Sequence, residues 1–337
     1  RATPMSVIEG AGEAPTRTST RRSRRRWPGQ LARVVVTLLA VTVAGFLLTS
    51  LIPGDIARSM AGPTAGEDAI AAIRAELRLD DPLLARYWHW LSNAVTGDLG
   101  RSFITRQPVV ESIVERLPVT VSLFVIAQIM AIVLGFVAGS FAALRPRSLL
   151  DRALDASTAL ILSIPAFVLG LGLVSVFAVR WHVFPAIGYS PIGDGVLPWL
   201  RSLVLPATCL ALGEAAIYAR VLKFELRTVL SEDYITLARA KGFSSSYVLV
   251  RHALRPCSLP LVTLIGINAG RVVGGAVVVE SLFALPGVGR LTVDSIGGRD
   301  YVVVQGIVVV VAASYVIVNV IIDAVYGRLD PRVRSSA

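Results

Sequence analysis

The stretch LPVTVSLFVIAQIMAIVLGFVAGSFAAL, residues 117–144, decides the fold class because it contains no charged residue. An α-helix needs about 20 consecutive apolar residues to cross the hydrocarbon core of a bilayer. Helices in the core of soluble proteins rarely run this long without a charge. The stretch therefore predicts a transmembrane helix, and similar runs lie on both sides of it.

Five further apolar runs extend the pattern along the chain. The runs 34–52, 156–179 and 302–322 are uncharged, while 202–219 and 256–279 each hold a single charged residue. Only 17% of the chain is charged and 54% is apolar, whereas a soluble domain carries about 25% charged residues. We expect an all-α polytopic membrane protein with six transmembrane helices, at 31–52, 117–144, 154–179, 202–221, 256–279 and 302–325.

Lysine and arginine are distributed unevenly about these spans. With six spans both termini share one side of the membrane, and that side carries 21 of the 33 basic residues, against 11 on the other. The richer side is expected to face the cytoplasm, so both termini should be cytoplasmic. The net charge of +10 is then explained by the excess of lysine and arginine in the segments that face the cytoplasm. The basic residues are spread over separate loops without interleaved aromatics, which argues against a nucleic-acid partner.

Three segments should lie outside the bilayer. Residues 1–30 include the run RRSRRR at 21–26 and predict a disordered basic tail held near anionic lipid headgroups. The 53–116 loop should be extracytoplasmic and contain two amphipathic helices, because apolar side chains recur there at helical spacing. Its aromatic residues suit a membrane interface. Residues 327–337 form a short cytoplasmic tail. The apolar positions of the two helices are Ile70, Ile73 and Leu77, then Leu84, Tyr87, Trp88 and Leu91.

No residue pattern predicts catalysis, a cofactor or a metal site. The three histidines lie in separate loops, without metal-ligand spacing. A phosphate-binding loop needs Gly-Lys-Ser/Thr, and neither Lys223 nor Lys241 follows a glycine. Gly287-Val288-Gly289 lacks the preceding strand of a dinucleotide-binding fingerprint, so we interpret it as a turn. The sequence predicts a protein that is not an enzyme and leaves ATP binding to a partner.

A polar interruption, residues 222–255, separates the fourth and fifth spans. SEDYITLARAK predicts a helix with Ser231 as N-cap, acids in its first turn, and Gly242 as the left-handed residue that ends it. A second helix is expected over 244–255. Two short helices around a glycine form an elbow that can sit in another protein's groove and transmit motion to the flanking spans. The alternative is a solvated connector.

The sequence around this elbow resembles a known family. DYITLARAKG at 233–242, followed by VLVRHALRPCSLPLV at 248–262, is similar to the cytoplasmic coupling loop of binding-protein-dependent ABC importer permeases. The resemblance is greatest to the dipeptide/oligopeptide/nickel subfamily, covers about residues 31–334, and extends to the long first outer loop typical of the first of two permease subunits. Further similar segments, in order, are PGD at 53–55, GDLGRS at 97–102, SIPAF at 163–167, ESLFALPGVGRL at 280–291, RDYVVVQG at 299–306 and NVIIDAVYGRLDPRVR at 319–334.

The resemblance implies a type I ABC importer permease in the bacterial cytoplasmic membrane, with residues 117–326 as its ABC transmembrane type-1 domain. It implies a heterodimer with a second permease, two cytoplasmic ATP-binding subunits and an extracytoplasmic substrate-binding protein. It implies di- or oligopeptides as substrate, with nickel, glutathione or another small molecule as alternatives. The residues that it places in the ATPase contact are Asp233, Tyr234, Leu237, Ala238, Arg239, Lys241 and Gly242.

Some residues depart from the family pattern. Glu214 and Arg271 stand within spans where the family usually carries neutral residues, and Lys223 stands where arginine is expected. Ionisable groups inside a membrane are costly and often functional. Glu214, Asn268 and Arg271 are therefore candidates to line the pore or contact substrate. A Glu214–Arg271 ion pair and contact with the partner permease remain open, although the two charges should differ in depth.

Two other classes of protein agree less well with the sequence. A self-sufficient secondary transporter would predict inverted internal repeats or discontinuous helices with buried carboxylates, and the sequence has no evident repeat and one acid well inside a span. A membrane-embedded enzyme would need a nucleophile and base, and no such set is evident.

Overall fold

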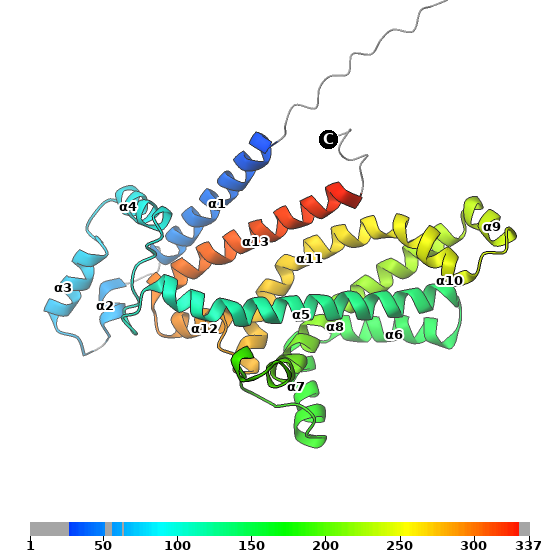
Figure 1. Ribbon diagram of the computed structural model, residues 1–337. Helices are drawn as coiled ribbons and strands as arrows, with labels where there is room; N and C mark the ends of the chain where they lie inside the picture. Colours follow the sequence, from blue (N-terminus) through cyan, green and yellow to red (C-terminus); the bar gives the residue numbers. More distant parts are fainter. Residues whose placement is uncertain (1–26, 51–55, 63, 330–337) are drawn as a thin grey trace, which may run out of the picture.

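The computed structural model describes residues 27–50, 56–62 and 64–329 (Figure 1). Within these ranges the chain is helical, and its only β-type pairing is an isolated bridge between Arg101 and Pro108. Most of the predicted basic tail, including RRSRRR, and the end of the C-terminal tail lie outside the described residues.

Among the described residues, three helices are long and apolar enough to cross a membrane: α5, α8, and α13 over Tyr301–Ile322. Two bent helix pairs could each form one more span, and α1 has a shorter apolar stretch. These helices coincide in sequence with the six predicted spans, and the six-span count stays a prediction. The bounds are α1 Trp27–Ser50, α5 Val109–Leu144, α6 Leu149–Ser163, α7 Ala166–Leu173, η1 Val174–Arg180, α8 Val196–Leu230, α10 Ser245–Tyr247, η3 Val248–Ala253, α11 Leu254–Leu282 and α13 Tyr301–Leu329.

Helices α5 and α8 lie side by side and share the most extensive contact of the described chain (Figure 1). Small residues permit their close approach. A Cβ added to Gly135 would lie 3.1 Å from the Ala215 carbonyl oxygen, and one added to Gly139 would lie 2.7 Å from the Ala219 carbonyl oxygen. Small residues one turn apart are a common way for helices to associate in membranes. Helix α11 packs against α8 and α13, and α1 packs along α13.

The prediction of one continuous helix over 154–179 was wrong. Helix α6 ends at Ser163, α7 begins at Ala166, and the two axes differ by 108°. The break follows from Pro165, because the residue before a proline is disfavoured in the helical conformation. Ile164 accordingly adopts an extended backbone with ψ 128°.

Helix α8 extends past residue 221, the predicted end of the fourth span. The loop was expected to begin at 222, but α8 continues to Leu230. No glycine or proline interrupts residues 214–230, and Leu222 and Leu226 are fully buried there with Ala143 of α5. Side-chain packing therefore extends the helix beyond the point where charged residues begin.

The predicted outer loop, residues 53–116, contains α2 (Ile56–Ala61), α3 (Glu67–Glu76) and α4 (Leu83–Val95). Helices α3 and α4 fall in the two stretches that were predicted to form amphipathic helices. Ile70 and Ile73 of α3 are buried beside α2, while Leu84 and Trp88 of α4 are 79% and 69% exposed. Figure 1 places α2–α4 at the end of the molecule opposite to α9 (Asp233–Ala240) and α10. Two shorter elements are η2 (Ile192–Asp194) and α12 (Val288–Gly297).

Candidate functional site

The polar interruption forms an elbow, residues 231–253, made of α9, a turn at Gly242, α10 and η3. Gly242 has φ +83°, as predicted. Its N–H donates to the Arg239 carbonyl at 2.9 Å, and the next N–H, of Phe243, donates to the Ala238 carbonyl at 3.4 Å. These two bonds make a Schellman motif, which satisfies the last carbonyls of a helix.

The start of α9 differs from the expectation. Ser231 is not its N-cap but the C-terminal cap of α8, and its hydroxyl donates to the Thr228 carbonyl at 2.7 Å. The N-cap of α9 is Glu232, without a side-chain cap. The two helices are thus joined by a very short connection, because α8 extends further than the sequence suggested.

One face of the elbow is anchored to the rest of the chain. Ile235, Ala238 and Val248 are buried together, with Val229 and Leu230 of α8 packed against them. Ala238 was predicted to contact the partner ATPase, but it is 7% exposed and faces this interior cluster. Ile235, which the sequence reasoning did not single out, is the fully buried anchor.

The opposite face presents large apolar and charged side chains. Tyr234 and Leu237 are 44% and 57% exposed, and Asp233, Arg239 and Lys241 are also exposed. Desolvation raises the pKa of Tyr234 above its usual value, and the nearby charge of Glu232 adds to this effect.

An exposed aromatic pair follows Gly242 in the elbow and was missed from the sequence. The rings of Phe243 and Tyr247 stack with centroids 5.0 Å apart, and His252 lies edge-on to Tyr247 at 5.7 Å. Both Phe243 and Tyr247 are more than two-fifths exposed. Exposed aromatic side chains that are held in place are typical of the central contacts of protein interfaces.

A charge cluster at the base of the elbow joins α8 to α6. Lys223 Nζ lies 2.6 Å from Asp151 Oδ1 and 2.5 Å from Asp155 Oδ1, and Arg227 Nη2 lies 2.7 Å from Asp151 Oδ2. Asp151 and Lys223 are both buried. In the sequence, Asp151 and Asp155 are four residues apart, and so are Lys223 and Arg227. Side chains at this spacing lie on the same face of a helix, and this was the available signal for the cluster. The cluster explains why Lys223, noted as a departure from the family, is retained inside a long apolar helix.

Two of the three predicted pore candidates are buried among the helices of the described structure. Glu214 of α8 and Asn268 of α11 are buried. One turn beyond Glu214, the Tyr218 hydroxyl accepts a hydrogen bond from Gln128 Nε2 of α5 at 2.8 Å. Arg271 lies in α11, but its side chain is outside the described structure. A pore-lining role for these residues stays a prediction. In the described part of the chain, no group of three or more His, Cys, Asp or Glu is arranged to hold a metal ion.

A buried carboxylate organises the segment at 280–291. Glu280 Oε1 accepts from the Thr120 hydroxyl of α5 at 2.7 Å, and Glu280 Oε2 accepts from the Arg290 N–H at 3.1 Å. A Cβ on Gly287 or Gly289 would overlap the Glu280 side chain. The two glycines, interpreted from the sequence as a turn, therefore allow the backbone at the start of α12 to close around a carboxylate.

A second polar contact joins two more of the sequence segments noted above. The Ser102 hydroxyl donates to Asp300 Oδ2 at 2.5 Å. A Cβ on Gly100 would lie 2.8 Å from Val302 Cγ1. The segments 97–102 and 299–306, far apart in the sequence, thus form one junction between the outer loop and the start of α13.

Comparison with known proteins identifies the family of this chain. Residues 120–335 match the family described as binding-protein-dependent transport system inner membrane component, and residues 25–124 match the corresponding N-terminal family. Among solved structures, the chain is similar to the inward-facing MetNI methionine ABC transporter, with TM-score 0.52 and 18% identity over 63% of this chain and 93% of that chain. This structural similarity shows that the two chains share a fold.

Curated relatives are similar over most of their length. A probable peptide ABC transporter permease, y4tP, of Sinorhizobium fredii is 40% identical over 90% of this chain and 98% of its own. A putative peptide transport system permease of Brucella abortus is 41% identical, and the glutathione transport permease GsiC of Escherichia coli is 37% identical, each over 90% of this chain and 97% of the relative. The chain is a multi-pass inner-membrane protein that belongs to the binding-protein-dependent transport system inner membrane component family, the permease subunits of ABC transporters.

Proposed function

We propose that this chain is the pore-forming subunit of an ATP-driven importer of di- or oligopeptides. The substrate class is supported by relatives named as peptide permeases and as a permease for glutathione, itself a tripeptide. Both termini are proposed to be cytoplasmic. In support, the first residues of α1 and the last described residues of α13 lie nearer to the elbow than the other ends of these helices do (Figure 1).

The proposed assembly contains a second, homologous permease, two ATP-binding subunits and an extracytoplasmic binding protein. The observation that carries the proposal is the elbow itself. It is anchored inside by Ile235 and exposes Tyr234 and Leu237 outside, and it continues at its two ends into α8 and α11. A partner that moves the elbow therefore moves two membrane helices.

The transmitted motion would not stop at α8. Because Lys223 and Arg227 are ion-paired to Asp151, displacement of the cytoplasmic end of α8 would carry α6 with it. Buried ion pairs hold a defined geometry, since separation leaves uncompensated charges in a medium of low polarity. We infer that the elbow, α8 and α6 move as one body when the ATPase subunits close.

Glu214, Asn268 and Arg271 are proposed to act at the translocation pathway. Buried polar groups in membrane helices commonly mark substrate pathways or helix contacts. ATP-dependent uptake of a labelled tripeptide into proteoliposomes tests this role. Arg271→Ala should lower uptake or change the peptide range, and unchanged uptake and range would remove Arg271 from the pathway.

The coupling role is tested by Leu237→Ala, with Leu149→Ala as a matched control. Leu149 is also a highly exposed leucine, but it lies on α6 and outside the elbow. Truncation of a central interface residue costs about 1–2 kcal/mol, or roughly 5- to 30-fold in affinity. Leu237→Ala should weaken ATPase binding by about that factor, and Leu149→Ala should not. Equal binding by both variants would contradict the proposed contact.

A further inference from the structure

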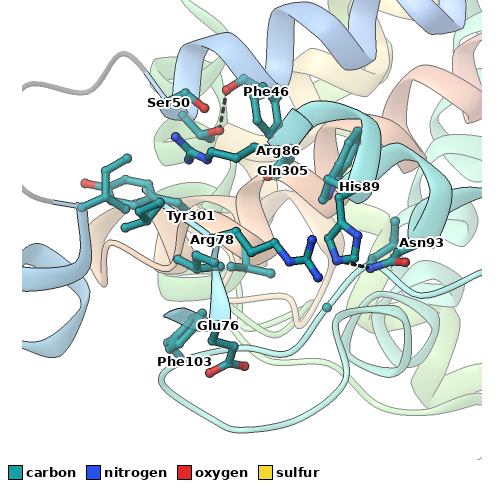
Figure 2. A pocket seen from close by; sticks show the side chains of 18 of the residues that line it. Phe46, Ser50, Glu76, Arg78, Arg86, His89, Asn93, Phe103, Tyr301 and Gln305 are labelled. Atoms are coloured by element: carbon teal, nitrogen blue, oxygen red, sulfur yellow. Dashed lines mark hydrogen bonds between the residues drawn. The ribbon is translucent and has the colours of Figure 1, made fainter. Parts of the chain in front are cut away.

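A cavity of about 190 Å³ lies between the outer-loop helices, the end of α1 and the start of α13. Figure 2 shows Arg86 and His89 from α4, Phe46 from α1 and Gln305 from α13 around it. It is separate from the elbow and from the buried pore candidates. Its volume is several times the roughly 30 Å³ that one water molecule occupies, so a larger group can fit.

Three hydrogen-bond donors of this wall have no acceptor among the described residues. They are Arg86 Nε, Trp90 Nε1 and Gln305 Nε2, and all three side chains line the cavity. Gln305 is only 9% exposed. Buried polar groups are nearly always paired, and exceptions point to an absent water, ion or ligand. Because all three are donors, the missing group must supply acceptor oxygens.

The charge of the lining favours an anion. Three arginines, Arg78, Arg86 and Arg101, line the cavity with two acids, Glu76 and Asp98. The Asp98 carboxylate already accepts from the Gly100 N–H at 2.9 Å. Desolvation lowers the pKa of Arg86, and the Asp81 charge offsets this only in part. A guanidinium that has lost part of its hydration gains from an oxyanion, with which it forms charge-assisted hydrogen bonds.

The surroundings of the cavity are those of a membrane surface. The cavity wall includes Phe46 near the end of α1, a helix whose apolar Leu39 and Leu47 are exposed. Helix α4 is fixed to α1 by a 3.0 Å hydrogen bond between the Tyr87 and Thr42 hydroxyls. Its Trp88 is exposed, and tryptophan is typical of the headgroup level of a bilayer. The buried donors thus lie beside a surface that is suited to contact lipid.

We propose that this cavity binds the phosphate of an outer-leaflet phospholipid, with Arg86, Trp90 and Gln305 as donors to its oxygens. The glycerol and upper acyl chain would lie along the exposed face of α1, which carries Leu39 and Leu47. Gln305 can present its amide N–H to the phosphate because the last torsion of glutamine is broad. A bound lipid would fix the outer loop to the bilayer at the junction with α13.

Native mass spectrometry of the full-length chain in mild detergent tests this site, with added phosphatidylglycerol or diacylglycerol of the same acyl chains. Phosphatidylglycerol should be retained and diacylglycerol should not. Arg86→Gln should lower retention about tenfold, since a charge-assisted hydrogen bond is lost. Gln305→Leu should lower it by a smaller factor, and this variant tests the site even if Arg86→Gln does not fold. As the control, Arg180→Gln should have no effect, because Arg180 is an exposed arginine of η1 that does not line the cavity.

The outcomes that overturn the proposal are distinct. Equal retention by the cavity variants and Arg180→Gln would mean that the lipid binds elsewhere. Equal retention of diacylglycerol would mean that the phosphate is not recognised. If inorganic phosphate alone displaces the lipid in a way that depends on Arg86, the site takes free phosphate, and the lipid assignment is wrong.

Discussion

Replacing Gly242 by alanine isolates the role of elbow shape. Gly242 has φ +83°, and a Cβ there would meet no atom within 4 Å. The substitution therefore acts only through the backbone. The left-handed conformation costs an L-residue about 1–2 kcal/mol, which corresponds to a roughly 5- to 30-fold loss in the population of the native turn.

Hydrogen exchange and ATPase measurements detect this loss at two levels. In Gly242→Ala the amides of Gly242 and Phe243, which close the turn onto α9, should exchange faster by about the same factor. In the assembled transporter, ATP hydrolysis should then proceed with less substrate transported per ATP. Gly242→Asn should fall nearer to the wild type, because asparagine tolerates this conformation better than alanine does.

Gly97→Ala is the matched control for strain alone. Gly97 follows α4 with φ +92° and also has open space around it, but it lies in the outer loop. Gly97→Ala should carry a similar backbone cost without uncoupling transport. If Gly242→Ala leaves exchange and coupling unchanged, or if Gly97→Ala uncouples equally, the elbow does not act through its shape.

Three further substitutions test the packing around the candidate sites, each by thermal unfolding of the detergent-purified protein. Lys223→Met should cost about 1–3 kcal/mol of unfolding free energy, because the buried Asp151 loses one of its two cationic partners and keeps Arg227. Lys241→Met at an exposed site should be nearly neutral, and equal melting temperatures of the two variants would contradict the cluster. Gly289→Ala should lower the free energy of unfolding by about 1–3 kcal/mol, because the added methyl group overpacks the backbone around Glu280. Gly297→Ala in the same helix has open space around it and should not. A larger loss for Gly297→Ala than for Gly289→Ala would contradict the close packing at Gly289. Ile235→Ala should cost about 2–5 kcal/mol of local stability and raise exchange across α9, and unchanged exchange there would show that this residue is not the anchor.

The long helices could be predicted because their signal is local. An uncharged run such as 117–144 has no stable alternative to a helix in a membrane. The conformation of Gly242 could also be predicted, since a glycine at the end of a helix commonly adopts positive φ. The break between α6 and α7 had a visible cause in Pro165, but apolar composition outweighed it in the prediction.

The tertiary contacts could not be predicted from local signals. Lys223 and Asp155 are 68 residues apart, and only the packing of α6 on α8 makes them partners. Likewise, nothing in the sequence near Ala238 distinguishes it from Leu237, although one faces inward and the other outward. That difference depends on where the end of α8 lies, and α8 proved longer than its apolar run.

The most direct test of the proposed function is the composition of the native complex. The tagged chain would be purified from its own membrane in mild detergent, and its partners identified and counted by mass spectrometry. We predict one copy of this chain with one second permease and two subunits that carry a phosphate-binding loop. Recovery of the chain alone, or as a homo-oligomer that transports without an ATPase, would contradict the account.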